Sequence, residues 1–181
     1  MAWTYEQNFN ALNTAALAGQ DSWAQFDGGA ENVEETVVFE GAKAVIGSGN
    51  EGHARRTIDA ITSGTFYVAV RPEVQGAAGI SGEVAVGINF TTGAGRAPAI
   101  FASGKIYSYR GGLIDTGLTY TLTKWGILKF RFDASTAHFW LDYNDNGAGY
   151  QGEKGPIDDA DDNTGDKVQL FIGHGHTGTI Y

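Results

Sequence analysis

The stretch "DYNDNGAGYQGE", residues 142–153, has the residue types and the spacing of a calcium-binding loop. Asp142, Asn144 and Asn146, then a glycine and, after five more residues, Glu153 match the pattern D-x-[DN]-x-[DN]-G-x5-E. Carboxylate and amide oxygens are the hard ligands that Ca²⁺ prefers, so these four side chains are candidate ligands of a structural calcium ion. The alternative is a polar turn, in which Asn and Asp adopt a left-handed backbone and bond to their own turn.

The flanking residues exclude the helix-loop-helix form of such a site. That form needs a helix on each side of the loop, whereas "AHFWL" at 137–141 alternates polar and apolar residues as a strand does. The eighth loop position is Gly149, where a β-branched residue normally pairs two loops. A calcium loop without helices remains as one hypothesis and the turn as the other. Four nearby carboxylates could supplement the ligands: Asp158, Asp159, Asp161 and Asp162.

A second candidate metal motif is "HGH", which contains His174 and His176. Two imidazoles on one face of a strand could hold a metal ion if a third ligand joined them. The other histidines, His53 and His138, are far away in sequence, and nothing in the pattern brings them together. We therefore expect an exposed turn at this position.

The segment "GSGNEG" at 47–52 matches the glycine pattern of dinucleotide-binding loops. Such a loop must be followed by a helix, whose N-terminus meets the pyrophosphate. Here "HARRTIDA" follows, and this segment is typical of a strand. We interpret 47–52 as a hairpin turn.

Alternation with a period of two residues dominates the chain and predicts strands. It is clearest in "TFYVAVR", "EVAVGINF", "ILKFRF" and "HFWLDY". Shorter strands are expected at "ETVVFE", "AKAVIG", "ARRTIDA", "AIFA", "KIYSY", "KVQLFIG" and "GTIY", and one short helix at "NALNTAALAGQ". The pattern predicts an all-β, two-sheet antiparallel sandwich forming a single domain over residues 1–181. Six apolar side chains are expected between the sheets: Val68, Val86, Phe130, Phe132, Leu141 and Leu170.

The opposite side of the same alternation is rich in aromatic and hydrogen-bonding side chains. Ala69, Ala85 and Gly87 are small and could form a shallow floor. The candidate glycan- or partner-binding residues around it are Tyr67, Arg71, Asn89, Tyr107, Tyr109, Lys129, Arg131, His138 and Trp140. Such a surface suits a sugar, whose ring stacks on aromatics and whose hydroxyls need partners. The alternative is that this face packs on a loop or another subunit.

Composition excludes several classes of function. The chain has 181 residues, no cysteine and a net charge of −9. The charge argues against nucleic acid and anionic lipid as partners, and the absence of cysteine excludes disulfides and cysteine-bound zinc. No apolar run is long enough for a membrane helix, and "MAWTYEQNFN" does not resemble a signal peptide.

Several segments resemble the concanavalin A-like lectin/glucanase superfamily, which includes the laminin-G-like modules. They are "YEQNFNALNTAALAGQDSW", "ARRTIDAITSGTFYVAVR", "AHFWLDYNDNG" and "KVQLFIGHGHTGTIY". The resemblance implies a jelly roll of the concanavalin A-like type, often used to bind glycans.

The catalytic signatures of that superfamily are missing from this chain. The laminarinase branch carries Glu-x-Asp-x-(x)-Glu on one strand, and no Glu-x-Asp occurs here. Glu34, Glu35 and Glu40 of "VEETVVFE" are the only substitutes considered, and Glu40 lies too far along to pair with the others. The Arg-x-Glu-Leu and Gln-(Ile/Val)-His strands of the alginate-lyase branch are missing too. We expect no enzymatic activity.

The sequence thus favours a non-catalytic, lectin-like β-sandwich. Because the opening residues also look similar to those of phage structural proteins with this fold, we expect a virion surface protein that decorates a capsid or appendage. Its partner would be a glycan or a capsid protein, with a homo-oligomer as a further option, and its location the virion surface or the extracellular space. The alternatives are a secreted carbohydrate-binding module and a glycan-cleaving enzyme of the laminarinase or lyase type.

Overall fold

The fold of the chain is taken from a computed structural model. It describes residues 7–25, 31–48, 52–58, 62–74, 84–89, 97–109, 112–158, 168–174 and 179–180. Structural statements below refer to these residues.

The described strands form three antiparallel sheets. The largest has seven strands in the order β1-β4-β14-β7-β8-β9-β10. They span Ala24–Gln25 (β1), Gly52–Ile58 (β4), Val168–His174 (β14), Val84–Asn89 (β7), Ala97–Ala102 (β8), Lys105–Tyr109 (β9) and Leu113–Thr119 (β10).

Two four-stranded sheets complete the architecture. One has the order β13-β12-β11-β5 and the other β2-β3-β15-β6. The first comprises Lys154–Asp158 (β13), His138–Asp145 (β12), Gly126–Asp133 (β11) and Ser63–Val70 (β5). The second comprises Glu31–Glu34 (β2), Ala44–Ser48 (β3), Thr179–Ile180 (β15) and Pro72–Val74 (β6).

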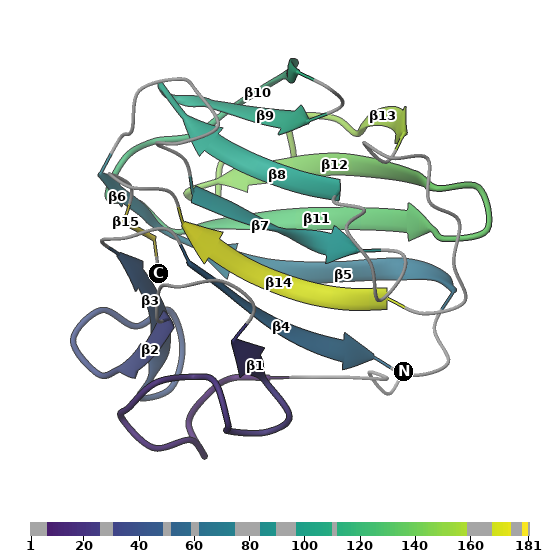
Figure 1. The fold of residues 1–181 in the computed structure, drawn as a ribbon. Coiled ribbons are helices and arrows are strands. Elements are labelled where there is room, and N and C mark those ends of the chain that lie inside the picture. Colours follow the sequence, from purple (N-terminus) through teal and green to yellow (C-terminus); the bar gives the residue numbers. More distant parts are fainter. Residues whose placement is uncertain are drawn as a thin grey trace.

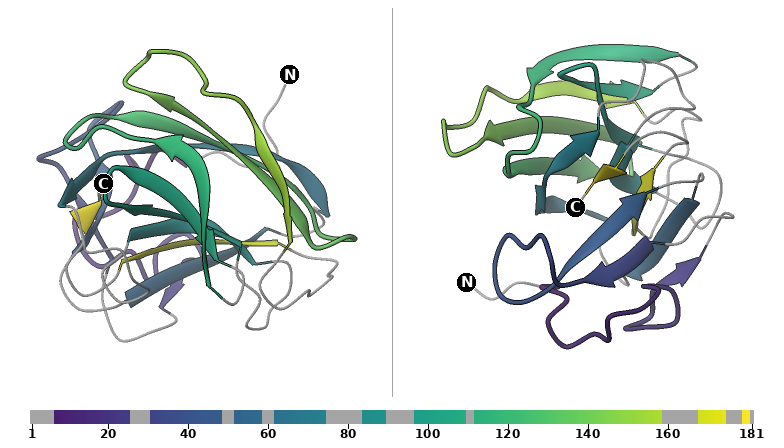
Figure 2. Two further views of the ribbon diagram at one scale, coloured as in Figure 1. Left: turned by 90° about the horizontal axis from the view of Figure 1, so that it is seen from above. Right: turned by 90° about the vertical axis from the view of Figure 1, so that its left-hand side faces the viewer.

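The seven-stranded sheet and the β13-β12-β11-β5 sheet pack face to face. Figure 1 shows β14, β7 and β8 in front of β5, β11 and β12, and the left view of Figure 2 shows the two layers from above. This is an all-β jelly-roll sandwich, so the predicted fold class is confirmed.

Strand β11 shows why the sequence forms this sandwich. Buried and half-buried residues alternate along its whole length, as a period of two requires of a strand with one face in the core. Leu128 and Phe130 are fully buried, and the Phe130 ring stacks on Phe139 at 5.2 Å and on Phe66 at 4.9 Å between ring centroids. Phe101 extends the core from the opposite sheet.

Most of the predicted core residues lie in this core. Val86, Phe130, Phe132 and Leu141 are buried, and Val68 is half-buried and packs against them. Leu170 belongs to β14, and its side chain lies outside the part of the chain that the structure describes.

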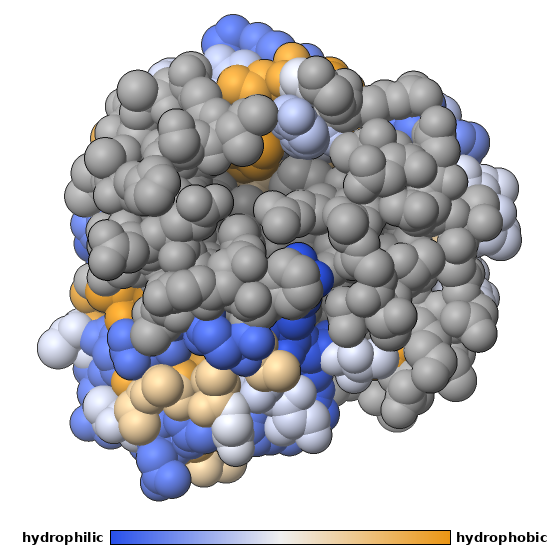
Figure 3. All heavy atoms as spheres, in the orientation of Figure 1, coloured by the Kyte–Doolittle hydropathy of each residue, from blue (hydrophilic) through white to orange (hydrophobic). Residues whose placement is uncertain are grey.

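A second, smaller core lies beside β4, and it changes the expected structure of the N-terminal segment. The predicted helix at "NALNTAALAGQ" is wrong, because the chain forms consecutive turns there. Leu17 and Trp23 from these turns pack with Val33, Val45 and Ala54. On the face drawn in Figure 3, the described residues around β1 to β3 are mostly hydrophilic with smaller hydrophobic areas between them.

Local hydrogen bonds explain why "ETVVFE" is not a strand. The Glu34 carboxylate accepts the backbone N–H groups of Thr36 and Val37, and the chain leaves β2 at that point. The segment at 47–52 does not close a hairpin either, because β3 and β4 join different sheets. Strands β1, β2, β6, β10 and β13 were not expected from the alternation.

Among the described residues there is no helix with the length and hydrophobicity needed to cross a membrane.

The first prediction concerns the core. Phe130→Ala should lower the free energy of unfolding by about 3–5 kcal/mol, because it removes a fully buried ring and leaves a cavity. Phe39→Ala is the matched control, since that ring is 48% exposed and should cost less than about 1 kcal/mol. Urea unfolding of both variants measures the difference. Similar losses in the two variants would contradict the observed register.

Candidate functional site

The outward side of the β13-β12-β11-β5 sheet carries the richest group of exposed polar and aromatic residues that the sequence analysis singled out. We call it the outer face. It consists of the residues that alternate with the buried ones: Thr65, Tyr67, Ala69, Ile127, Lys129, Arg131, Asp133, His138, Trp140, Asp142 and Asn144.

The strand register brings the predicted residues of this face together. Lys129 in β11 lies opposite Tyr67 in β5 and Asp142 in β12. Arg131, two residues further along β11, lies opposite Trp140. Because cross-strand partners are about 4.5–5.5 Å apart at their Cβ atoms, these five side chains form one continuous group.

Glu153 links the two cations of this group. Its Oε1 accepts a hydrogen bond from the Arg131 Nη2 at 2.5 Å, and its Oε2 lies 3.3 Å from the Lys129 Nζ. The pKa of Glu153 is lowered, mainly by the hydrogen bond from Arg131. Burial raises this pKa, and the hydrogen bond from Lys129 lowers it further. Glu153 is therefore an ionised carboxylate at neutral pH and holds both cations in place.

Trp140 is covered by its neighbours. The Arg131 guanidinium carbon lies 3.6 Å from the centroid of the Trp140 ring, which is a cation–π arrangement. On another side the backbone of Gly155 is so close that a Cβ there would lie 2.6 Å from the Trp140 Cδ1. His138 meets the ring edge-on at 6.1 Å, and its Nε2 lies 2.8 Å from the Asp158 Oδ1. Trp140, one of the aromatic residues that the sequence suggested for sugar binding, thus contacts other groups of the protein.

The exposed aromatic rings of this region are two tyrosines. Tyr67 is 48% exposed and Tyr150, in the turn after β12, is 45% exposed. Partial burial and the nearby Tyr67 and Asp142 raise the pKa of Tyr150, while Lys129 opposes the rise. Tyr150 also pairs with Asn144 through an isolated β-bridge, which places its turn beside the outer face.

Sequence reasoning missed Tyr150 because it was counted only as a variable position of the calcium pattern. The available signal was its type and place, a large aromatic residue between Gly149 and Gly152 in an otherwise polar turn.

The turn that carries Tyr150 is tied to the sheet on several sides. Asp142 Oδ1 accepts the N–H of Gly152 at 2.9 Å, and Asn144 Oδ1 accepts the N–H of Gly149 at 2.9 Å. The Gln151 side chain accepts the Thr119 N–H at 3.0 Å and donates to the Thr119 carbonyl at 2.6 Å. These bonds fix the backbone on both sides of Tyr150.

The same contacts account for the four candidate calcium ligands. Asp142 and Asn144 accept backbone N–H groups, and Glu153 binds Lys129 and Arg131. Asn146 has a φ of 50°, the left-handed backbone that the turn alternative requires. Within the described residues no group of three or more His, Cys, Asp or Glu side chains is placed to hold a metal ion. These contacts therefore favour the hydrogen-bonded turn, and the calcium loop remains the alternative hypothesis.

Four other predicted residues lie away from the outer face. Tyr107 and Tyr109 belong to β9 and Asn89 to β7, so all three are in the seven-stranded sheet. The small residues that were expected to form one floor are also in two sheets. Ala69 is in β5, whereas Ala85 and Gly87 are in β7 of the seven-stranded sheet. Arg71 follows β5, where its guanidinium binds the Thr123 carbonyl and the Glu73 carboxylate at 3.0 and 2.8 Å.

The histidines are divided between two sheets. His138 is in β12, whereas His53 and His174 are in the paired strands β4 and β14 of the seven-stranded sheet, where His174 pairs with Gly52 and His53 with Gly173. His176 and residues 159–163 of the acidic run lie outside the described residues. The strand β4 follows the "GSGNEG" segment, so the helix that a dinucleotide loop requires is not there.

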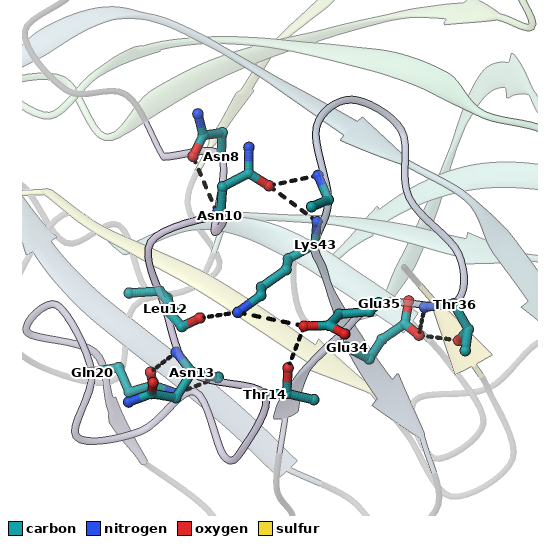
Figure 4. Close-up of polar contacts among 11 residues, drawn as sticks. Asn8, Asn10, Leu12, Asn13, Thr14, Gln20, Glu34, Glu35, Thr36 and Lys43 are labelled. Atoms are coloured by element: carbon teal, nitrogen blue, oxygen red, sulfur yellow. Dashed lines mark hydrogen bonds and ion pairs between the residues drawn. The ribbon is translucent and has the colours of Figure 1, made fainter.

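The three candidate catalytic glutamates lie in and after β2, which belongs to a different sheet from the outer face. Figure 4 shows two of them within a local network of polar contacts. Glu35 accepts a hydrogen bond from Thr14 at 2.9 Å and lies 3.6 Å from the Lys43 Nζ, which also donates to the Leu12 carbonyl at 2.5 Å. Hydrogen bonds from Thr36 and Val37 outweigh burial and lower the pKa of Glu34.

These contacts indicate that Glu34 and Glu35, the two glutamates in Figure 4, have structural roles. Glu34 shapes the turn after β2, and Glu35 helps to tether Lys43 to the N-terminal turns. A general acid needs a raised pKa, so the lowered pKa of Glu34 argues against that role.

Comparison with solved structures found the same kind of fold at low sequence identity. A sialidase structure aligns with 96% of this chain at a TM-score of 0.59 and 10% identity, and this chain spans 15% of its length. The cellulose-induced protein Cip1 aligns over 90% of this chain and 89% of its own length, at a TM-score of 0.56 and 14% identity. In sequence, neither a family profile nor a curated protein matches the chain. The two structures support a β-sandwich consistent with the concanavalin A-like fold.

The second prediction concerns calcium. Because the candidate ligands already bind protein groups, we expect the melting temperature in millimolar calcium to agree with that in EDTA within about 1 °C. Differential scanning calorimetry measures both. A higher melting temperature in calcium that disappears in Asp142→Asn would contradict the turn interpretation and establish the calcium loop.

Proposed function

We propose that the protein is a non-catalytic carbohydrate-binding module that uses the outer face. The observation that carries this proposal is the position of Tyr67, an exposed ring on the regular edge strand β5 with Lys129 directly opposite in β11. An aromatic ring offers a flat apolar surface to the C–H face of a sugar, and an ammonium group donates hydrogen bonds to its hydroxyls.

The geometry around Tyr67 supports this use. The strands of the sheet position Tyr67 and Lys129 without a mobile loop, and Glu153 restrains the Lys129 side chain at 3.3 Å. A rigid site loses little conformational entropy on binding, which raises affinity for a ligand as polar as a sugar. The fold shared with the sialidase and Cip1 is compatible with this proposal, but it shows architecture alone.

The absence of catalysis is part of the proposal. Glycoside hydrolysis normally needs two carboxyl groups, one of them with a raised pKa. The carboxylates around Lys129 are Glu153, whose pKa is lowered by Arg131 and Lys129, and Asp142, which is buried and accepts backbone N–H groups. Neither is suited to donate a proton to a glycosidic oxygen.

We also propose the virion surface as the location, with the extracellular space as the alternative for a secreted module. The support for a virion is the resemblance of the opening residues to phage structural proteins, and it is independent of the outer face. In that setting the same tyrosines and cations could contact a capsid protein, since Tyr and Arg are frequent anchors of protein interfaces.

The third prediction tests the absence of activity. Incubation with β-glucans and alginate should release no reducing ends and no unsaturated products beyond one equivalent of protein. Reducing-sugar and ultraviolet-absorbance assays detect the two products. Repeated turnover that is lost in Glu153→Gln would overturn the non-catalytic assignment.

The fourth prediction tests the binding face. Tyr67→Ala should weaken retention on a glycan array by about tenfold, because it removes the exposed ring and leaves the core unchanged. Phe39→Ala is the control, since Phe39 is equally exposed at 48% and lies outside the outer face. Light scattering on the same samples reports the oligomeric state. Loss of an oligomer in Tyr67→Ala with glycan retention unchanged would replace the glycan proposal with an assembly interface.

A further inference from the structure

Tyr150 has the features of a ligand-contacting residue that the proposed function does not yet use. Its ring is 45% exposed even though its backbone is held in place. It pairs with Asn144 through an isolated β-bridge, and the next residue, Gln151, donates its N–H to the Tyr143 carbonyl at 3.1 Å. The Gln151 side chain then binds Thr119 of β10 twice.

Gly, Pro, Asn, Asp and Ser dominate turns, whereas this turn presents a large ring from a backbone fixed by hydrogen bonds on both sides. The Asp145 carboxylate adds another tie, because it accepts the backbone N–H of Thr121 at 3.1 Å and its hydroxyl at 2.6 Å. A ring held in this way costs little entropy when a ligand stacks on it.

The turn of Tyr150 borders the outer face that carries Tyr67. Tyr150 pairs with Asn144 of that face, and besides partial burial, Tyr67, Asp142 and Lys129 affect its pKa. Lys129 lies opposite Tyr67 on one side and opposite Asp142 on the other, and Asp142 holds the turn through Gly152. Two exposed rings thus stand beside a lysine and a buried carboxylate.

The charges of this region indicate the class of ligand. Lys129 and Arg131 are both within ion-pair distance of Glu153, and Asp142 lies opposite Lys129, so the two positive charges are matched by two negative ones. The whole chain carries a net charge of −9. An anionic sugar would therefore meet no positive field, and binding it would require breaking an existing ion pair.

We infer that Tyr150 and Tyr67 together form a sugar-binding platform for neutral glycans, in which the turn 142–153 serves to present Tyr150. This inference rests on the proposed glycan-binding function and assigns its ligand class and a second contact residue. The hydroxyl groups of the sugar would meet Lys129, the tyrosine hydroxyls and the outer edge of Glu153, which are donors and acceptors without net charge as a group.

The experiment measures binding of the full chain to defined oligosaccharides by calorimetry. The neutral probes are hexamers of glucose in β-1,4 and β-1,3 linkage, of mannose and of xylose, and the acidic probes are hexamers of galacturonate and guluronate. At least one neutral probe should bind. Because a neutral oligosaccharide carries no charge for salt to screen, the dissociation constant of its complex with the protein should change by less than about twofold between low and high salt.

Tyr150→Ala should weaken that binding by about tenfold, and Tyr150→Phe, which keeps the ring, by less than about threefold. Phe39→Ala should leave it unchanged, and circular dichroism with thermal melting should show that all three variants keep the fold. A folded Tyr150→Ala variant with unchanged affinity would overturn the role of Tyr150. Binding of an acidic probe alone, weakened by salt, would overturn the neutral ligand class.

The outcomes separate this inference from the proposed function. If a glycan binds and Tyr67→Ala weakens it but Tyr150→Ala does not, the function stands and the inference fails. If no probe and no glycan on an array binds, the proposed function fails and the inference with it. If Tyr150→Ala changes only the oligomeric state, the surface is a protein interface and the inference is wrong.

Discussion

The antiparallel pairing of β11 with β5 on one side and β12 on the other is the constraint on which the rest of the structure depends. Eight consecutive residues of β11, Gly126 to Asp133, pair with both neighbours without a bulge. Because side chains alternate across a strand, a shift by one residue would turn Phe130 outward and Lys129 into the core. The burial of Leu128, Phe130 and Phe132 therefore also fixes where Lys129 and Arg131 stand. The core and the candidate site are two consequences of one register.

Glu153 and the turn before it organise the outer face on top of that register. The ion pairs of Glu153 add little to stability, since the Arg131 side chain is 40% exposed and such pairs contribute about 0–1 kcal/mol. Their effect is positional, because one carboxylate holds a lysine and an arginine and places the arginine over Trp140. The residues that match a calcium loop use their oxygens to bind the turn to itself and to the sheet. The same pattern of Asp and Asn thus supports a rigid turn that exposes Tyr150.

The similarity to the sialidase and to Cip1 concerns architecture, and the function has to be argued from the site. The outer face and the adjoining turn combine two exposed tyrosines with charges that cancel around Lys129, which favours an uncharged, hydroxyl-rich ligand over an ionic one. Of the carboxylates around Lys129, Glu153 is ionised and Asp142 is buried, which favours binding over bond cleavage. These properties depend on side-chain contacts, which a comparison of folds does not include.

The sequence by itself determined the strand class of most segments and the inward residues of the central strands. It did so because a period of two residues is a local property, readable along one strand without knowing its neighbours. It correctly grouped Tyr67, Lys129, Arg131, His138 and Trp140, whose strands turned out to be adjacent. It failed for Tyr107 and Tyr109, because alternation says which side of a strand a residue occupies and not which sheet the strand joins.

Only the tertiary structure decided how exposed each of these residues is. Trp140 is covered by Arg131 and by the backbone at Gly155, a residue 15 positions further along the chain. A local sequence pattern does not predict a contact of this kind. The predicted helix near the N-terminus gave way to turns because Leu17 and Trp23 are buried against β2, β3 and β4. Tyr150 became a candidate contact because hydrogen bonds to β10 and β12 hold its turn in place. Long-range packing, which fixes sheet order and burial, is the physical reason that these features could not be predicted from the sequence.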